Sequence, residues 1–77
     1  MPKPRIALRR LLFGCYETKQ GPLVASGEYM IRRMADRRWY VYRPESDEYP
    51  IGGIKFRMRR EALEWLTNRL IDRPKGD

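Results

Sequence analysis

The sequence contains no histidine and a single cysteine, Cys15, among its 77 residues. One cysteine cannot form an internal disulfide, and structural zinc sites are built from cysteine and histidine ligands that this chain lacks. The absence of histidine also excludes nucleophilic catalysis by a Ser-His or Cys-His pair. We therefore expect a protein with no cofactor, no metal site and no enzymatic activity.

Long apolar runs are missing as well. No stretch approaches the roughly 20 apolar residues of a membrane span, and residues 11–13 are too few for the core of a signal peptide. These absences predict a cytoplasmic protein without a membrane span, in which Cys15 is reduced. A chain of this length forms one small domain that buries little surface, so a homo-oligomer remains open.

Positive charge is what the sequence has in excess. It has 17 basic residues, 13 of them arginine, against 10 acidic residues, which gives a net charge of +7. Such a surplus attracts phosphates, anionic membranes or acidic proteins. Arginine in particular binds phosphate and guanine through paired hydrogen bonds, although a GC-rich genome produces the same arginine bias. The surplus lies in residues 1–43 and 55–60, whereas residues 44–54 carry only acidic charges.

The middle of the chain has the composition of β-strands. Residues 29–34 and 39–43 are rich in aromatic and apolar side chains and flank the polar residues 35–38, which predicts a β-hairpin. Residues 49–56 are predicted to form a third strand, in which two glycines indicate a bulge or a close backbone approach. Residues 61–71 have apolar side chains at helical spacing and predict an amphipathic helix.

The first part of the chain is ambiguous. Leu8, Leu11, Leu12 and Cys15 recur at helical spacing, which favours a short helix, with a strand over residues 11–16 as the alternative. The expected fold class is α+β: a three-stranded antiparallel sheet packed on one C-terminal helix, with an N-terminal short helix or extra strand. The chain is then a single domain over residues 1–77, divided into an uncertain N-terminal element (1–27), a sheet-plus-helix core (28–71) and a frayed tail (72–77).

The alternation of side chains along the predicted strands separates a core face from an open face. The core set is Ile31, Trp39, Val41, Ile54 and Phe56, packed against Ala62, Leu63, Leu66 and Leu70. Arginine on the open face reaches phosphate or guanine, and tyrosine supplies flat contact area, although tyrosine is also common there for its strand propensity alone. With phosphate contacts added from the hairpin turn and the helix start, the candidate nucleic-acid-binding residues are Arg32, Arg33, Arg37, Arg38, Tyr40, Tyr42, Lys55, Arg57 and Arg59.

Residues 29–44, the glycine-containing segment after them, and Phe56 followed by Glu61-Ala62 carry a resemblance to known families. Residues 28–71 resemble the arm-site-binding N-terminal domain of phage tyrosine integrases and are similar to the Apetala-type transcription-factor domain. Both families insert a three-stranded sheet into the major groove. The resemblance implies that Arg32, Tyr40, Tyr42 and Lys55 face bases or sugars, and that Ile31, Trp39, Val41 and Phe56 belong to the core. Met34, Pro44 and residues 51–54 depart from the family pattern.

The expected function is that of a small basic DNA-binding protein of phage or bacterial origin, which contacts duplex DNA with the open face of its sheet. The alternative is a phage-type protein-binding module that inhibits or modulates a host protein through the same face or an edge strand, because exposed aromatic residues and arginine also dominate protein interfaces. A weaker third hypothesis is association with a membrane surface through the basic residues 5–13.

Overall fold

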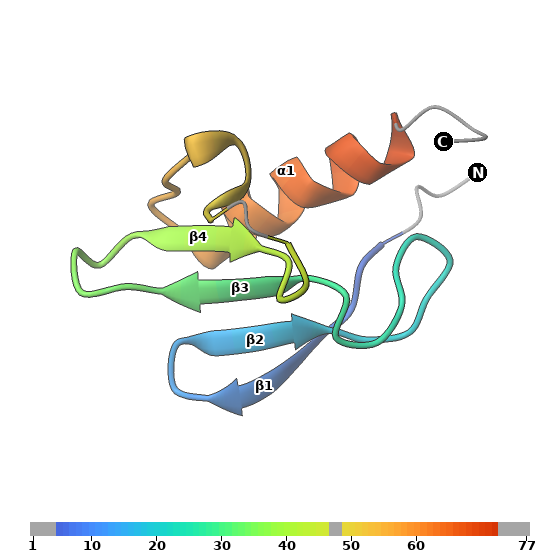
Figure 1. Ribbon diagram of the computed structural model, residues 1–77, viewed down its shortest axis with the longest axis horizontal. Coiled ribbons are helices and arrows are strands. Elements are labelled where there is room, and N and C mark those ends of the chain that lie inside the picture. Colours follow the sequence, from blue (N-terminus) through green and yellow to red (C-terminus); the bar gives the residue numbers. More distant parts are fainter. Residues whose placement is uncertain (1–4, 47–48, 73–77) are drawn as a thin grey trace.

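The structure is a computed structural model that describes residues 5–46 and 49–72. Its four-stranded antiparallel sheet has the strand order β1-β2-β3-β4, and one helix, α1, lies on one side of it (Figure 1). The elements are β1 (Leu8–Leu12), β2 (Cys15–Thr18), β3 (Met30–Arg33), β4 (Trp39–Tyr42), the short 3-10 helix η1 (Ile51–Gly53) and α1 (Arg59–Ile71). The predicted α+β class is confirmed, whereas the predicted number of strands is not.

The N-terminal segment is a β-hairpin, so the short helix expected from the leucine spacing is wrong. The alternative of an extra strand is right in type, but β1 and β2 take the place of one strand over residues 11–16. Leu12 pairs with Cys15 across a two-residue turn made by Phe13 and Gly14. Gly14 has a φ of +75°, which a glycine adopts at no steric cost. The turn at Gly14 thus places the apolar residues of helical spacing on two different strands, and these strands complete the sheet beside β3.

The predicted third strand over residues 49–56 is also wrong. Gly52 and Gly53 have φ values of +69° and +64°, which are incompatible with an extended strand, and they form η1 instead. Only Phe56 reaches the sheet, where its backbone exchanges hydrogen bonds of 2.8 and 2.9 Å with Trp39. Lys55 and Arg57 therefore flank a single bridge and are both exposed, rather than standing on a strand.

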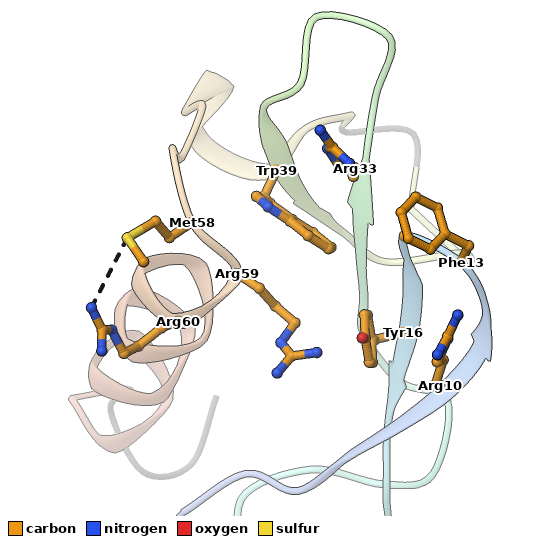
Figure 2. Close-up of a pocket in the computed structure, with 9 residues that line it drawn as sticks. Arg10, Phe13, Tyr16, Arg33, Trp39, Met58, Arg59 and Arg60 are labelled. Atoms are coloured by element: carbon orange, nitrogen blue, oxygen red, sulfur yellow. Dashed lines mark hydrogen bonds between the residues drawn. The ribbon is translucent and has the colours of Figure 1, made fainter.

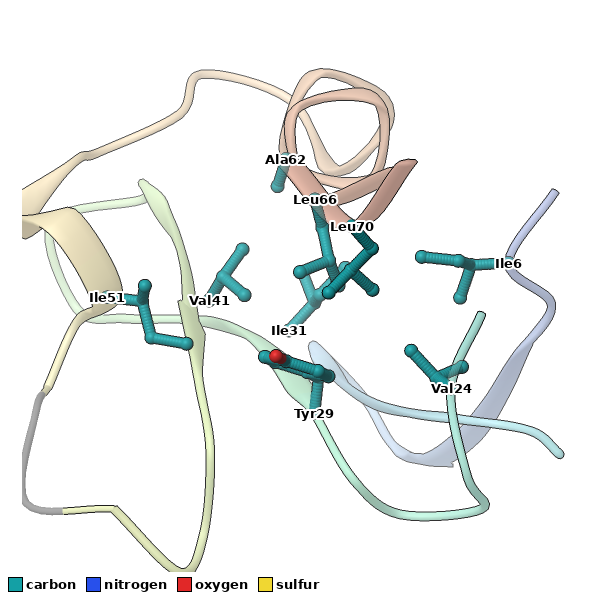
Figure 3. Close-up of a cluster of buried hydrophobic side chains, with 9 residues drawn as sticks. All are labelled: Ile6, Val24, Tyr29, Ile31, Val41, Ile51, Ala62, Leu66 and Leu70. Carbon is teal, nitrogen blue, oxygen red and sulfur yellow. The ribbon is translucent and has the colours of Figure 1, made fainter. Parts of the chain in front are cut away.

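The core lies between α1 and the sheet (Figure 3). Ile31, Val41 and Leu66 are at most 1% exposed, and the helix packs against β3 and β4. Most of the predicted core set is confirmed, with Trp39, Phe56 and Leu63 partly buried at its margin and Ile54 half-buried outside the cluster. The core also includes residues that were not predicted, namely Ile6, Val24, Tyr29 and Ile51.

Thr18 is the one polar side chain among the buried described residues, and it is fully enclosed. Its hydroxyl oxygen donates to the Ala25 carbonyl at 3.0 Å and accepts from the Tyr29 backbone N–H at 3.2 Å. Because a buried hydroxyl is tolerated only when it is hydrogen-bonded, these contacts satisfy Thr18 and hold the connection between β2 and β3 against the sheet.

The predicted tail over residues 72–77 lies outside the described residues, apart from Asp72. The Asp72 backbone N–H donates to the Asn68 carbonyl oxygen at 3.1 Å.

Within residues 5–46 and 49–72, no helix has both the length and the apolar character that crossing a membrane requires.

Candidate functional site

The sheet face opposite α1 carries three of the predicted site residues. Strand pairing aligns Cys15 with Arg32 and Arg32 with Tyr40, and in the next row Met30 lies between Glu17 and Tyr42. Side chains of directly paired residues lie on the same side of a sheet. Arg32, Tyr40 and Tyr42 therefore share this face, as predicted from alternation.

Tyr49 lies against this face and covers part of it. Its ring is 4.7 Å from the Tyr42 ring between centroids, and its hydroxyl donates to the Met34 sulfur at 3.4 Å. Burial raises the pKa of Tyr42 above 10.0, and Cys15 on the same face is only 7% exposed. The face therefore offers less free surface than the strand pattern alone suggests.

Tyr40 has a partner of its own on the same side. Its hydroxyl donates a short hydrogen bond to the Asp36 carboxylate, which also accepts from the Arg38 backbone N–H at 2.9 Å. The bond from Tyr40 is the main cause that holds the pKa of Asp36 below 3.8. Because Asp36 is bonded to Tyr40 and Glu17 lies on the same side of the sheet as Arg32, this face carries negative charge and is less suited to phosphate than expected.

Replacing Tyr40 by phenylalanine is expected to raise the pKa of Asp36 toward 3.8, because the largest stabilising contact of the carboxylate is lost while the bond from Arg38 remains. Folding lowers this pKa, so any contribution of Asp36 to stability is present above the unfolded-state value and is lost as the pH falls below about 4. Carboxylate NMR titration measures the shift. Tyr42→Phe serves as the control, and an unchanged Asp36 titration in Tyr40→Phe would contradict the contact.

A second surface lies on the helix side of the sheet, where a basic-aromatic groove of about 360 Å³ opens (Figure 2). It is bordered by the β1–β2 hairpin, by the ends of β3 and β4, and by the start of α1. The groove is lined by Arg10, Phe13, Gly14, Tyr16, Arg33, Trp39, Met58, Arg59 and Arg60.

The fold creates this groove because α1 packs on β3 and β4, while its backbone does not approach β1 or β2 closely. Pairing of Arg10 with Tyr16 puts both residues on the helix side, next to Ile31 in the core row. Tyr16 is therefore left beside the helix start, where the Arg59 guanidinium lies 4.4 Å from the centre of its ring. The Trp39 ring follows at 6.0 Å from that of Tyr16, so the groove has an aromatic wall.

All the charged side chains that line the groove are positive. Its four arginines form no ion pair with any described carboxylate, and no acidic side chain is among the described residues that line it. Arg9 and Arg43 differ, because each lies within 4 Å of a glutamate oxygen, at 3.8 and 3.9 Å. The four lining arginines are thus available to an external anion.

The first turn of α1 adds to the positive electrostatic potential of the groove. Met58 occupies the N-cap position, and its side chain caps no backbone N–H of the helix; its sulfur accepts instead from the Arg60 guanidinium at 4.0 Å (Figure 2). A helix N-terminus carries partial positive charge, and its first N–H groups have no partner within the helix. Arg59 and Arg60 therefore stand where the helix itself disfavours cations, which an anion in the groove would compensate.

A second hollow of about 350 Å³ adjoins the groove and shares three of its residues. Phe13, Gly14 and Arg33 line both hollows. Arg37, from the β3–β4 turn, lines the second hollow but not the groove. Arg37 adopts a φ of +64°, in the left-handed region that costs a non-glycine residue about 1 kcal/mol. The two hollows together form one basic end of the molecule.

Of the predicted site residues, the structure brings three together at the two hollows, namely Arg33, Arg37 and Arg59. Arg32, Tyr40 and Tyr42 lie on the other face, and Arg38, Lys55 and Arg57 are exposed but line neither hollow. Arg10, Phe13 and Tyr16 were not predicted, whereas Arg60 was considered with Arg59 as a phosphate contact at the helix start. Recognition of Gly14 as the turn of a hairpin would have put Arg10 and Tyr16 on neighbouring strands, but in a regular register Leu11 would stand opposite Tyr16. The irregularity between Arg10 and Leu12 brings Arg10 to that position instead.

Residues 5–46 and 49–72 contain no cluster of acidic and cysteine side chains that could hold a metal ion. The donors of the site are cationic and aromatic, which suits an anion with planar groups. Comparisons with protein-family models, curated proteins and solved structures find no match for this chain, so the interpretation of its basic end rests on the geometry just described.

Proposed function

We propose that this chain binds duplex DNA and that the basic-aromatic groove, with the adjoining hollow at Arg37, holds the phosphates. The observation that carries the proposal is the convergence on one groove of four arginines that form no ion pair with any described carboxylate, without an acidic residue among the described lining residues. Arginine binds phosphate through two parallel hydrogen bonds, and its contacts with the DNA backbone supply most of the affinity in non-specific binding.

An extended polyanion suits this surface better than a small anion does. The five arginines come from β1, β3, the β3–β4 turn and the start of α1, and they are spread over two adjoining hollows. A site for one small ligand is typically an enclosed pocket with a few convergent polar groups. Here the cations line two adjoining open hollows, which several successive phosphates of a DNA strand can contact.

The helix-side groove replaces the open sheet face as the proposed contact surface. On the open face, Tyr40 is bonded to Asp36 and Tyr42 packs on Tyr49, whereas the groove arginines lack such partners among the described carboxylates. Arg32 on the open face then contributes to the long-range attraction of DNA rather than to the direct contact.

A salt titration of binding to random-sequence duplex DNA tests the proposal. Release of counterions from five phosphate contacts predicts a log-log slope of about −4.5, which corresponds to a loss of affinity of about 500-fold between about 50 and 200 mM salt. Fluorescence anisotropy with a labelled duplex measures this slope.

Absence of binding at about 50 mM salt would reject the proposal, because electrostatic attraction is strongest under such conditions. A protein-binding module would then be the better hypothesis. Its specific support is the edge position of β1, whose outer side pairs with no other described strand and is open to strand addition.

A further inference from the structure

The end of β1 and the turn after it expose three consecutive apolar side chains. Leu11, Leu12 and Phe13 are 46%, 62% and 74% exposed, so Phe13 is the most exposed large apolar residue of the described chain. Single exposed apolar residues are ordinary, whereas a contiguous exposed group beside charged residues marks an interaction site.

The turn at Phe13 and Gly14, which forms the tip of the first hairpin, is held to the rest of the sheet. The Arg33 N–H donates a 2.7 Å hydrogen bond to the Gly14 carbonyl, which ties the turn of the first hairpin to β3. A side chain at position 14 would lie 3.3 Å from the Arg33 Cβ, so the two hairpins are in close contact there. Phe13 is therefore presented to solvent from a backbone that is already held in place. Binding of Phe13 to a partner would then lose little conformational entropy of the loop.

Cations flank the exposed ring. Phe13 lines the groove that holds Arg10, Arg59 and Arg60, and it also lines the hollow that holds Arg37. Arg33 borders both, and the Arg10 guanidinium lies 5.9 Å from the centre of the Phe13 ring. The most exposed apolar side chain thus separates two basic hollows.

We propose that Phe13 is a wedge that inserts between two base pairs of duplex DNA and kinks the duplex, while the arginines of the two hollows hold the phosphates on either side. The inference rests on the DNA binding proposed above and adds how the DNA is deformed. Proteins that bend DNA insert phenylalanine or leucine in this way, and the phosphate contacts offset the lost base stacking.

The shape of the surface favours DNA over an anionic membrane. A membrane presents a flat charged plane, which an apolar tip enters while the basic residues stay at one level around it. Here the arginines lie in concave hollows of about 360 and 350 Å³ next to a convex tip. A duplex has the matching relief, with ridges of phosphate beside grooves that expose the edges of the base stack.

Ring closure of a short DNA fragment by ligase tests the wedge without knowledge of a preferred sequence. A fragment of about 120 base pairs is shorter than the persistence length of about 150 base pairs and closes slowly unless a protein bends it. We expect the wild-type protein to accelerate closure by about tenfold or more, Phe13→Ala by less than about twofold, and Phe13→Trp to retain most of the effect. Ile71→Ala, which removes an exposed apolar side chain at the far end of α1, is the matched control and should behave as wild type.

Binding and bending are measured on the same samples, so that the two proposals fail separately. Loss of acceleration in Phe13→Ala, with salt-dependent binding retained and the circular dichroism spectrum unchanged, supports the wedge. Wild-type protein that binds duplex DNA without accelerating closure would overturn the wedge and leave the proposed function intact. Wild-type protein that fails to bind would overturn both. If Phe13 proves necessary for binding to vesicles of anionic phospholipid but not for closure, the tip is a membrane contact and the wedge is rejected.

Discussion

Leu66→Ala is expected to lower the free energy of unfolding by about 3 kcal/mol, within the range of about 2–5 kcal/mol found for leucine truncation in a core. Leu66 is fully buried on α1 and belongs to the same cluster as Ile31 and Val41. A domain of this size has a total stability of roughly 4–12 kcal/mol, so the loss is a large part of it. Urea unfolding followed by circular dichroism measures the change in midpoint.

Leu63→Ala is the control for Leu66→Ala, because it makes the same truncation on the same helix at a half-buried position. We expect it to cost about 1 kcal/mol, since less apolar area is removed from the interior. Equal losses for the two variants would show that α1 does not pack through Leu66 as described. In either variant, a change in the slope of the unfolding curve would instead indicate an altered denatured state.

Replacing the four groove arginines together by glutamine is expected to reduce affinity for duplex DNA by more than about 100-fold near 50 mM salt and to lower the log-log salt slope by about 3.6. The substituted residues are Arg10, Arg33, Arg59 and Arg60. Removal of Arg59 and Arg60 also removes cations from the helix N-terminus, where they are unfavourable, so this change does not weaken the start of α1. Anisotropy titrations at several salt concentrations measure both quantities.

A second variant with equal loss of charge separates the groove from general electrostatics. Glutamine at Arg32, Arg38, Lys55 and Arg57 also removes four positive charges from a net charge of +7, but from residues that line neither hollow. We expect the salt slope of this variant to fall by less than about one unit, because long-range attraction is reduced while the phosphate contacts remain. A larger effect here than in the groove variant would return the contact surface to the open sheet face.

The residues of β3, β4 and α1 were predictable because their local pattern agrees with their place in the fold. Alternation along residues 29–34 and 39–43 correctly separated Ile31 and Val41 from Arg32 and Tyr42. Helical spacing identified Ala62, Leu66 and Leu70, which are all buried. In these segments a single periodicity dominates, and the tertiary packing uses it unchanged.

The errors lie where a glycine decides the chain direction. Leu8, Leu11 and Leu12 fit a helix as long as the chain continues past Gly14, but the left-handed φ of Gly14 reverses it. Gly52 and Gly53 end the predicted third strand in the same way. Spacing rules cannot anticipate these reversals, because a short apolar run fits both a helix and a strand until its partner is known.

The sequence by itself determined that this is a basic α+β domain with one amphipathic helix and a hairpin, because composition and periodicity are local properties of the chain. The location of the basic end was decided by the tertiary structure. Arg10, Arg33 and Arg59 are far apart along the chain and line one groove only because β1 pairs with β2 and the start of α1 lies beside Tyr16. Charge is counted along a sequence, whereas a binding surface depends on which distant side chains the pairing of strands and the packing of the helix bring together.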